Sequence, residues 1–322
     1  MVIVQVCILY NPSVFKTHGM DYTMWTEQMK RIDSKSEYRN VVIGDSRGSA
    51  GVDPLKLGGR WENLSLPGGS LIEAYLTYHR HIKAGNRLDT LLLMFSVEQM
   101  DHEPRWFNRN AIPYHLIEAD ELDSLEARER ELNWFHGHGR MGSGAELFLQ
   151  QTRRRLRYMN APVNFLDNFE RGIKDLIYKK KTNDSIRMSI VHSLRTTRGH
   201  VRFGTAECDS TVGLMAEDTF ALSYINRYYL DRLLKDVASA GTRVLFFVAP
   251  YNESTCRVFS GSLHEASMRS TLEAFEKTYP NLIVETGLMC LPDSCFGDNA
   301  HLNLRGVDTY QPLLRERINS LR

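Results

Sequence analysis

Three short segments of the sequence contain residue types that together could carry out acyl transfer on a serine hydroxyl. The first is Gly44-Asp45-Ser46-Arg47-Gly48, which ends the apolar stretch 40–44. A serine in a tight turn after a strand exposes its hydroxyl, and the backbone amides behind it can bind an oxyanion. Ser46 is therefore a candidate nucleophile. The alternative is an ordinary turn, because Gly-Asp-Ser is also good turn chemistry.

The second segment is Asp298-Asn299-Ala300-His301, just before the last predicted helix. An acid three residues before a histidine can place its carboxylate on the imidazole ring. His301 would then accept the serine proton, while Asp298 holds the required tautomer. Helix capping beside a surface histidine is the alternative interpretation.

The third segment runs from Asn63 to Ser70 and contains Gly68-Gly69. It precedes a helix, and a helix N-terminus favours negative charge. The backbone amides of Gly68 or Gly69, together with that of Ser46, are candidate oxyanion donors. The alternative is a plain loop that leads into a helix.

Hydrophobic periodicity predicts the elements that must position these segments. Apolar strands alternate with amphipathic helices; the strands are expected at 40–44, 91–95, 244–249 and 282–284, and the helices at 70–84, 219–240, 264–278 and 304–321. This alternation predicts a three-layer α/β fold of the flavodoxin-like kind, with a mostly parallel sheet between helices. Ligands of such sheets bind at the carboxyl ends of the strands.

The predicted domain covers 38–322 and is interrupted by a charged, largely helical insertion at about 101–215. Within it, 118–131 holds seven acids and two arginines, whereas 151–202 holds thirteen basic residues and four acids. These stretches are either solvated helical faces or a surface for an anionic partner. The segment 1–37 contains the nine-residue apolar run 2–10, which is either an early strand or the remnant of a membrane anchor.

Composition excludes several classes of protein. The 322 residues have a formal net charge of +1 and are 42% hydrophobic, with a mean hydropathy of −0.36. These values exclude a wholly disordered chain and a polytopic membrane protein, and they give no reason to expect nucleic-acid binding.

The cysteines and histidines outside the three segments predict no cofactor and no metal. The five cysteines are too few for a disulfide framework. Cys290 and Cys295 are close enough in sequence to form a disulfide, but in a loop pair of this kind two unbonded thiols are the more usual outcome. Cys256 has no identified base partner that would make it a nucleophile. His136 and His138 have no nearby acid that would complete a metal site.

Taken together, the order and placement of the three segments resemble the SGNH (GDSL-like) hydrolase superfamily. The resemblance covers about 38–107 and 232–321 and rests on GDSRGSAGVDP, NLSLPGGSLIEAY and DNAHLN. It implies a serine esterase or acyltransferase with Ser46 as nucleophile, His301 as base and Asp298 as its partner. The oxyanion would be held by the amides of Ser46 and of Gly68 or Gly69.

One block departs from that family. Its usual Gly-x-Asn-Asp, whose Asn side chain also enters the oxyanion hole, is replaced here by 95–99, FSVEQ. Ser96, Gln99 or Arg47 could substitute for the missing amide, and Asp45 is a further auxiliary candidate. With this departure the sequence is similar to SGNH-like proteins of bacterial envelope polysaccharide modification, including alginate O-acetylation and teichoic-acid D-alanylation proteins.

This resemblance implies serine-dependent transfer of an acyl group, expected to be acetyl, onto or off a cell-surface glycan. The expected partners are an acyl donor, the glycan and a membrane-bound acyltransferase, with an extracytoplasmic location and membrane association through the N-terminus. Two alternatives stay open. One is a catalytically inactive SGNH domain that binds glycan or helps assembly, and the other is a soluble intracellular esterase.

Overall fold

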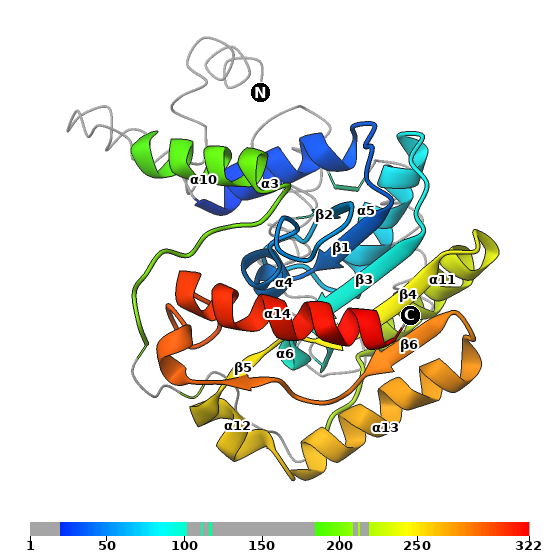
Figure 1. Ribbon diagram of the computed structural model, residues 1–322. Coiled ribbons are helices and arrows are strands. Elements are labelled where there is room, and N and C mark those ends of the chain that lie inside the picture. Colours follow the sequence, from blue (N-terminus) through cyan, green and yellow to red (C-terminus); the bar gives the residue numbers. More distant parts are fainter. Residues whose placement is uncertain are drawn as a thin grey trace, which may run out of the picture.

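The computed structural model describes residues 20–101, 184–208 and 219–321, together with residues 111, 116, 117 and 212. Within these ranges it has a five-stranded sheet of order β2-β1-β3-β4-β6 (Figure 1). Every pair of neighbouring strands in it is parallel. The strands are β1 (Asn40–Gly44), β2 (Trp61–Asn63), β3 (Thr90–Phe95), β4 (Arg243–Val248) and β6 (Leu282–Glu285). The predicted α/β class and mostly parallel sheet are confirmed.

The central strands form because their sequences are apolar on both faces. All six residues of β3 are buried, as expected of a parallel strand that is covered on both sides. Gly44 ends β1 beside Met94, and a Cβ atom at this position would lie 2.0 Å from the Met94 carbonyl oxygen. A glycine is therefore needed where the chain leaves β1 next to β3.

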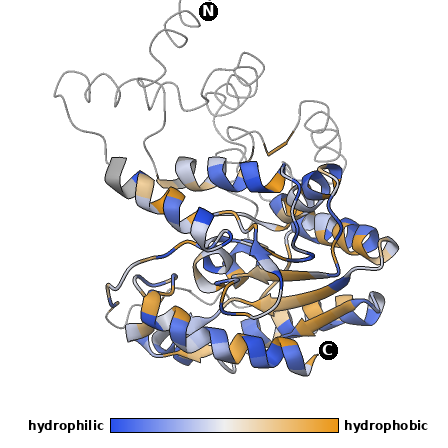
Figure 2. Cartoon of the chain, turned by 45° about the horizontal axis from the view of Figure 1, so that its top comes forward, coloured by the Kyte–Doolittle hydropathy of each residue, from blue (hydrophilic) through white to orange (hydrophobic). Residues whose placement is uncertain are grey.

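Helices cover the two faces of the sheet and make two separate cores. One core contains Leu91, Leu93 and Phe246 and lies under α3 (Met20–Ile32), α5 (Leu71–Lys83), α11 (Tyr224–Ser239) and α13 (Leu263–Thr278). The other contains Leu92 and Phe247 and lies under α14 (Leu304–Ser320). Figure 2 shows the apolar strands inside and the polar residues on the outer surfaces of the helices. The result is a three-layer structure.

The helix boundaries follow from capping. Ser70 and Glu73 form a capping box at the start of α5, in which the Ser70 amide donates to Glu73 Oε2 at 2.8 Å. The long helix predicted from residue 219 begins later, at Tyr224, because the Ser223 hydroxyl caps it by accepting from the Asn226 amide.

Two predicted boundaries differ from the structure, namely the start of the domain and the end of the insertion. Trp25, on α3, is fully buried in the same core as the central strands, although the sequence analysis places it before the domain. The helix α10 (Asp184–Thr196) lies within the predicted insertion, yet it packs against α3 (Figure 1). Gln28 Nε2 joins these parts by donating to the carbonyls of Asn63, Ser65 and Gly199. Residues 20–37 and 184–208 therefore belong to the α/β domain.

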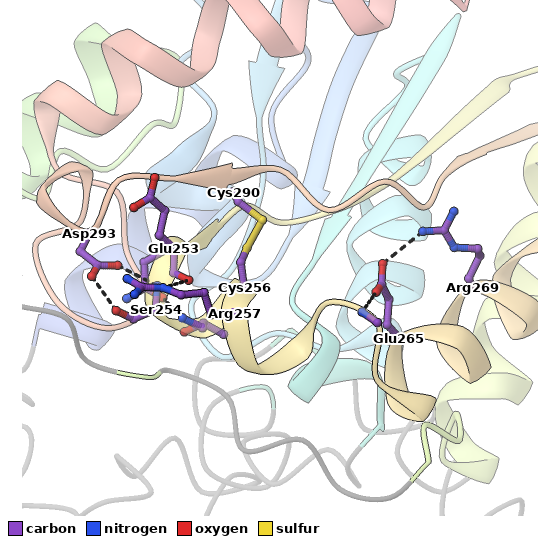
Figure 3. Close-up of a disulfide and its surroundings, with 11 residues drawn as sticks. Glu253, Ser254, Cys256, Arg257, Glu265, Arg269, Cys290 and Asp293 are labelled. Atoms are coloured by element: carbon purple, nitrogen blue, oxygen red, sulfur yellow. Dashed lines mark hydrogen bonds and ion pairs between the residues drawn. A yellow bond between two sulfur atoms is a disulfide. The ribbon is translucent and has the colours of Figure 1, made fainter.

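The disulfide joins a different pair of cysteines from the one considered in the sequence analysis. Cys256 on α12 (Glu253–Phe259) is bonded to Cys290 on β7 (Cys290–Leu291), as Figure 3 shows. Parallel pairing of β7 with β5 (Tyr251–Asn252) brings Cys290 over α12. Cys295, at the end of the 3₁₀ turn Asp293–Cys295, is a free thiol buried in the core under α14.

In the part of the chain that the structure describes, none of the helices is long and apolar enough to span a membrane.

Candidate active site

Ser46 is the first residue of the short helix α4 (Ser46–Gly51), immediately after β1. Asp45 caps this helix through Oδ1, which accepts from the amides of Arg47 at 2.8 Å and Gly48 at 3.3 Å. Asp45 Oδ2 accepts from the Ser96 amide at 2.9 Å, just beyond the end of β3. Asp45 thus ties the serine turn to the neighbouring strand, and Ser96 takes part through its backbone.

Ser46, His301 and Asp298 lie in one hydrogen-bonded chain, although 255 positions separate the serine from the histidine. His301 Nε2 is 2.8 Å from Ser46 Oγ. On the other side of the ring, His301 Nδ1 is 2.8 Å from Asp298 Oδ2 and 3.0 Å from Oδ1. The candidate nucleophile, base and acid of the sequence thus lie within hydrogen-bonding distance of one another.

The Asp298–His301 turn is held by its own backbone. Phe296 and Leu302 form an antiparallel bridge, and the Gly297 amide donates to the His301 carbonyl at 2.9 Å. Asp298 Oδ1 also accepts from the amides of Ala300 and His301. Partial burial opposes ionisation, but the hydrogen bonds and charge of His301 and these amides lower the pKa of Asp298 to about 2. Asp298 is therefore a carboxylate near neutral pH.

Phe203 is a residue of the site that the sequence analysis missed. Its ring stacks on the His301 ring, with the centroids 4.4 Å apart and the planes 9° from parallel. Two backbone hydrogen bonds hold its segment to the histidine turn, from Cys208 to the Phe296 carbonyl and from Leu304 to the Gly204 carbonyl. Nothing in the local sequence marks Phe203, because only the folded chain brings it to His301.

The glycine loop lies beside the serine turn because backbone hydrogen bonds hold it there. The Leu66 amide donates to the Gly44 carbonyl at 2.9 Å, and Gly68 has a φ of +69°, which favours glycine. The Gly69 amide donates to the Leu66 carbonyl at 2.9 Å. Of the two glycine amides considered as oxyanion donors, Gly69 is therefore committed to its own turn, and Gly68 is the better candidate.

Arg47 occupies the space between the ends of β1, β3 and β4. Its guanidinium Nη2 donates to Glu98 Oε1 at 2.8 Å and its Cζ lies 4.3 Å from the centre of the Tyr251 ring. The Tyr251 hydroxyl donates to Glu98 Oε2 and accepts from the Val97 amide, each at 2.9 Å. This cluster of Arg47, Glu98 and Tyr251 stands where the sequence analysis noted the missing asparagine.

The strand order explains why the site lies here. In the sheet, β2 lies on one side of β1, and β3, the next strand along the chain, lies on the other side. Parallel α/β sheets bind ligands at this switch point, beyond the carboxyl ends of the strands. Ser46 follows β1 and Ser96 follows β3, so both lie at the switch point.

Among the described residues, no group of three or more His, Cys, Asp or Glu side chains could hold a metal ion. The histidines 136 and 138, the apolar run 2–10 and most of the charged stretches lie outside the described residues. No protein-family model matches the chain, and no curated protein matches its sequence.

Proposed function

We propose that this protein is a serine esterase or O-acyltransferase of the SGNH type, which works through an acyl-enzyme on Ser46. The observation that supports this proposal is the continuous chain Ser46 Oγ, His301 Nε2, His301 Nδ1 and Asp298 Oδ2, with both links at 2.8 Å. This is the arrangement that a general base needs to activate a serine hydroxyl. The order of the motifs along the chain points to the same family.

In the first half-reaction, His301 Nε2 takes the Ser46 proton as Oγ attacks the carbonyl carbon of an ester. The carbonyl π electrons move onto oxygen, and the amides of Ser46 and Gly68 donate to this oxyanion. When the intermediate collapses, the ester C–O bond breaks and the leaving alkoxide takes the proton from the imidazolium. Asp298 stabilises the positive ring throughout and stays ionised.

In the second half-reaction, a hydroxyl group attacks the acyl-serine and gives its proton to His301. Collapse of the second tetrahedral intermediate returns the proton to Ser46 Oγ. Water as the attacking group gives hydrolysis, and a sugar hydroxyl gives acyl transfer. We propose acetyl as the acyl group and a cell-surface glycan as donor or acceptor, which rests on the motif resemblance.

We place this reaction outside the cytoplasm. The Cys256–Cys290 disulfide supports this location, because structural disulfides persist in oxidising compartments and are rare in the cytosol. The same proposal includes a membrane-bound acyltransferase as the source of the acyl group, with membrane association through the N-terminal segment.

A fluorophosphonate probe tests the nucleophile directly. We expect labelling of the intact protein at Ser46, no labelling of Ser46→Ala, and strongly reduced labelling of His301→Ala. Ser49→Ala is the matched control, because Ser49 lies on the same helix and its hydroxyl is buried. Absence of labelling of the folded wild type, at several pH values, would overturn the enzyme proposal and favour a glycan-binding component.

A further inference from the structure

The side chain next to the nucleophile carries a buried donor that its neighbours leave unsatisfied. Arg47 is 6% exposed, and among the described residues its Nη1 atom has no hydrogen-bond partner. An unmatched charged donor inside a protein is costly, so such groups usually meet an anion or a strong acceptor. Of the two terminal nitrogens of Arg47, Nη2 thus has a hydrogen-bond partner and Nη1 has none among the described residues.

Glu98 binds only one of the two terminal nitrogens of Arg47. An arginine and a carboxylate often form two parallel hydrogen bonds. Here Glu98 Oε1 accepts from Arg47 Nη2, but Oε2 accepts from the Tyr251 hydroxyl. Each carboxylate oxygen has one of these hydrogen bonds, neither accepts from Arg47 Nη1, and the ring of Tyr251 lies against the guanidinium. The cluster holds Arg47 in place while it leaves Nη1 without an acceptor.

The guanidinium lies at the same edge of the sheet as the serine and histidine. Its anchors, Glu98 and Tyr251, follow β3 and β4, and Arg47 itself follows Ser46. Burial alone would lower the pKa of Arg47, but the negative charge of Glu98 and, more weakly, that of Asp298 raise it. The carboxylate that is hydrogen-bonded to His301 is thus among the groups whose charge raises the pKa of Arg47.

We propose that Arg47 is a catalytic residue whose Nη1 donates a hydrogen bond to the oxyanion that forms on the acyl carbonyl oxygen during attack by Ser46. This inference rests on the proposed function. The Arg47 backbone amide is engaged by Asp45, so only the side chain can serve. It would add a charged donor to the amides of Ser46 and Gly68. Its positive charge is permanent, and Glu98 and Tyr251 hold it before substrate arrives.

The test compares Arg47→Lys and Arg47→Met in the hydrolysis of p-nitrophenyl acetate, a small neutral ester. Loss of one oxyanion donor lowers kcat by ~10²–10³-fold. We expect a fall of this size in Arg47→Met, with KM changed less than about threefold. Lysine keeps the charge but lacks the fork that could hold Glu98 and reach the oxyanion together, so Arg47→Lys should also lose most of kcat.

Arg31 provides the matched control, because it is a largely buried arginine on α3 that donates to the Leu194 carbonyl, outside the site. Arg31→Lys and Arg31→Met should keep kcat within about threefold. Thermal melting identifies variants that do not fold. If Arg47→Met does not fold, the kcat of Arg47→Lys decides the result.

A kcat within threefold of wild type in folded Arg47→Lys would overturn the inference. Loss with a negatively charged ester but not with p-nitrophenyl acetate would also overturn it, because Arg47 would then bind a charged substituent. Both results leave fluorophosphonate labelling of Ser46 intact, whereas failure of the proposed function removes labelling of the wild type.

Discussion

Removal of the Cys256–Cys290 disulfide should lower stability strongly and activity little. The two cysteines are 34 positions apart. A cross-link that closes a loop of this length removes denatured-chain entropy worth about 4 kcal/mol at 25 °C. This is a large part of the ~5–15 kcal/mol by which a domain is usually stable. Reduction of the disulfide should therefore raise the equilibrium constant for unfolding by roughly a thousandfold.

Activity should survive because other contacts hold the same junction. The Ser254 amide donates to Asp293 Oδ1 at 3.0 Å, and the Ser254 hydroxyl donates to Asp293 Oδ2 at 2.6 Å (Figure 3). Parallel pairing of β5 with β7 lies beside them. These contacts keep the chain that leads to His301 in place without the disulfide. We expect kcat of Cys256→Ser at 20 °C to stay within about threefold of wild type.

Urea unfolding with and without reductant measures the first effect. With an m-value of about 3 kcal/mol/M, a loss of 4 kcal/mol lowers the midpoint by roughly 1.3 M. Cys256→Ser and Cys290→Ser should have the midpoint of the reduced protein and be insensitive to reductant. Cys208→Ser, which alters a free thiol, is the control and should respond to reductant as wild type does. Equal midpoints in both conditions, or alkylation of Cys290 without reductant, would refute the reasoning.

Four further predictions concern the site and the residues that support it. Asp298→Asn should lower kcat by ~10³–10⁴-fold, because the amide no longer holds the required histidine tautomer; unchanged steady-state kinetics would contradict this role. Because the folded pKa of Asp298 is about 2 and the unfolded value is about 3.9, its ionised form stabilises the fold above pH 4. That contribution should disappear as pH falls to 2, so the difference in unfolding free energy between wild type and Asp298→Asn should shrink over this window. Phe203→Leu should lower kcat roughly 10-fold or more with little change in KM, since the stacked ring no longer fixes His301, and Phe203→Tyr should restore it; a leucine variant with full kcat would exclude a positioning role. Gly199→Ala should lower the melting temperature more than Gly204→Ala. Both glycines have positive φ, but only at Gly199 would the new Cβ lie 1.9 Å from a carbonyl oxygen; equal melting temperatures would contradict the close approach.

Two parts of the molecule had little local signal. The helix α3 precedes the predicted domain, and the segment 184–208 falls within the predicted insertion. Their place depends on long-range contacts such as the Gln28 hydrogen bonds and the burial of Trp25. The disulfide is similar, because sequence proximity allows Cys290 to pair with Cys295 but favours two free thiols, whereas strand pairing brings Cys290 to Cys256. Disulfide bonding requires Cα atoms within about 7 Å, and spacing along the chain does not determine that distance.

The sequence by itself determined the layers of this protein and the candidates for its chemistry. Runs of buried apolar residues specify parallel strands, and amphipathic periodicity specifies the helices that cover them. The end of a strand identifies Ser46, and the spacing of an acid three residues before a histidine identifies the Asp298–His301 pair. These signals are local, because each depends on residues close together in the chain.

Only the tertiary structure decided which groups touch. It brought Ser46 to His301 and Phe203 onto the histidine ring. It also left Arg47 Nη1 without an acceptor among the described residues. Such contacts depend on the packing of elements far apart in the chain, where side-chain directions and the competition for each hydrogen bond are settled together.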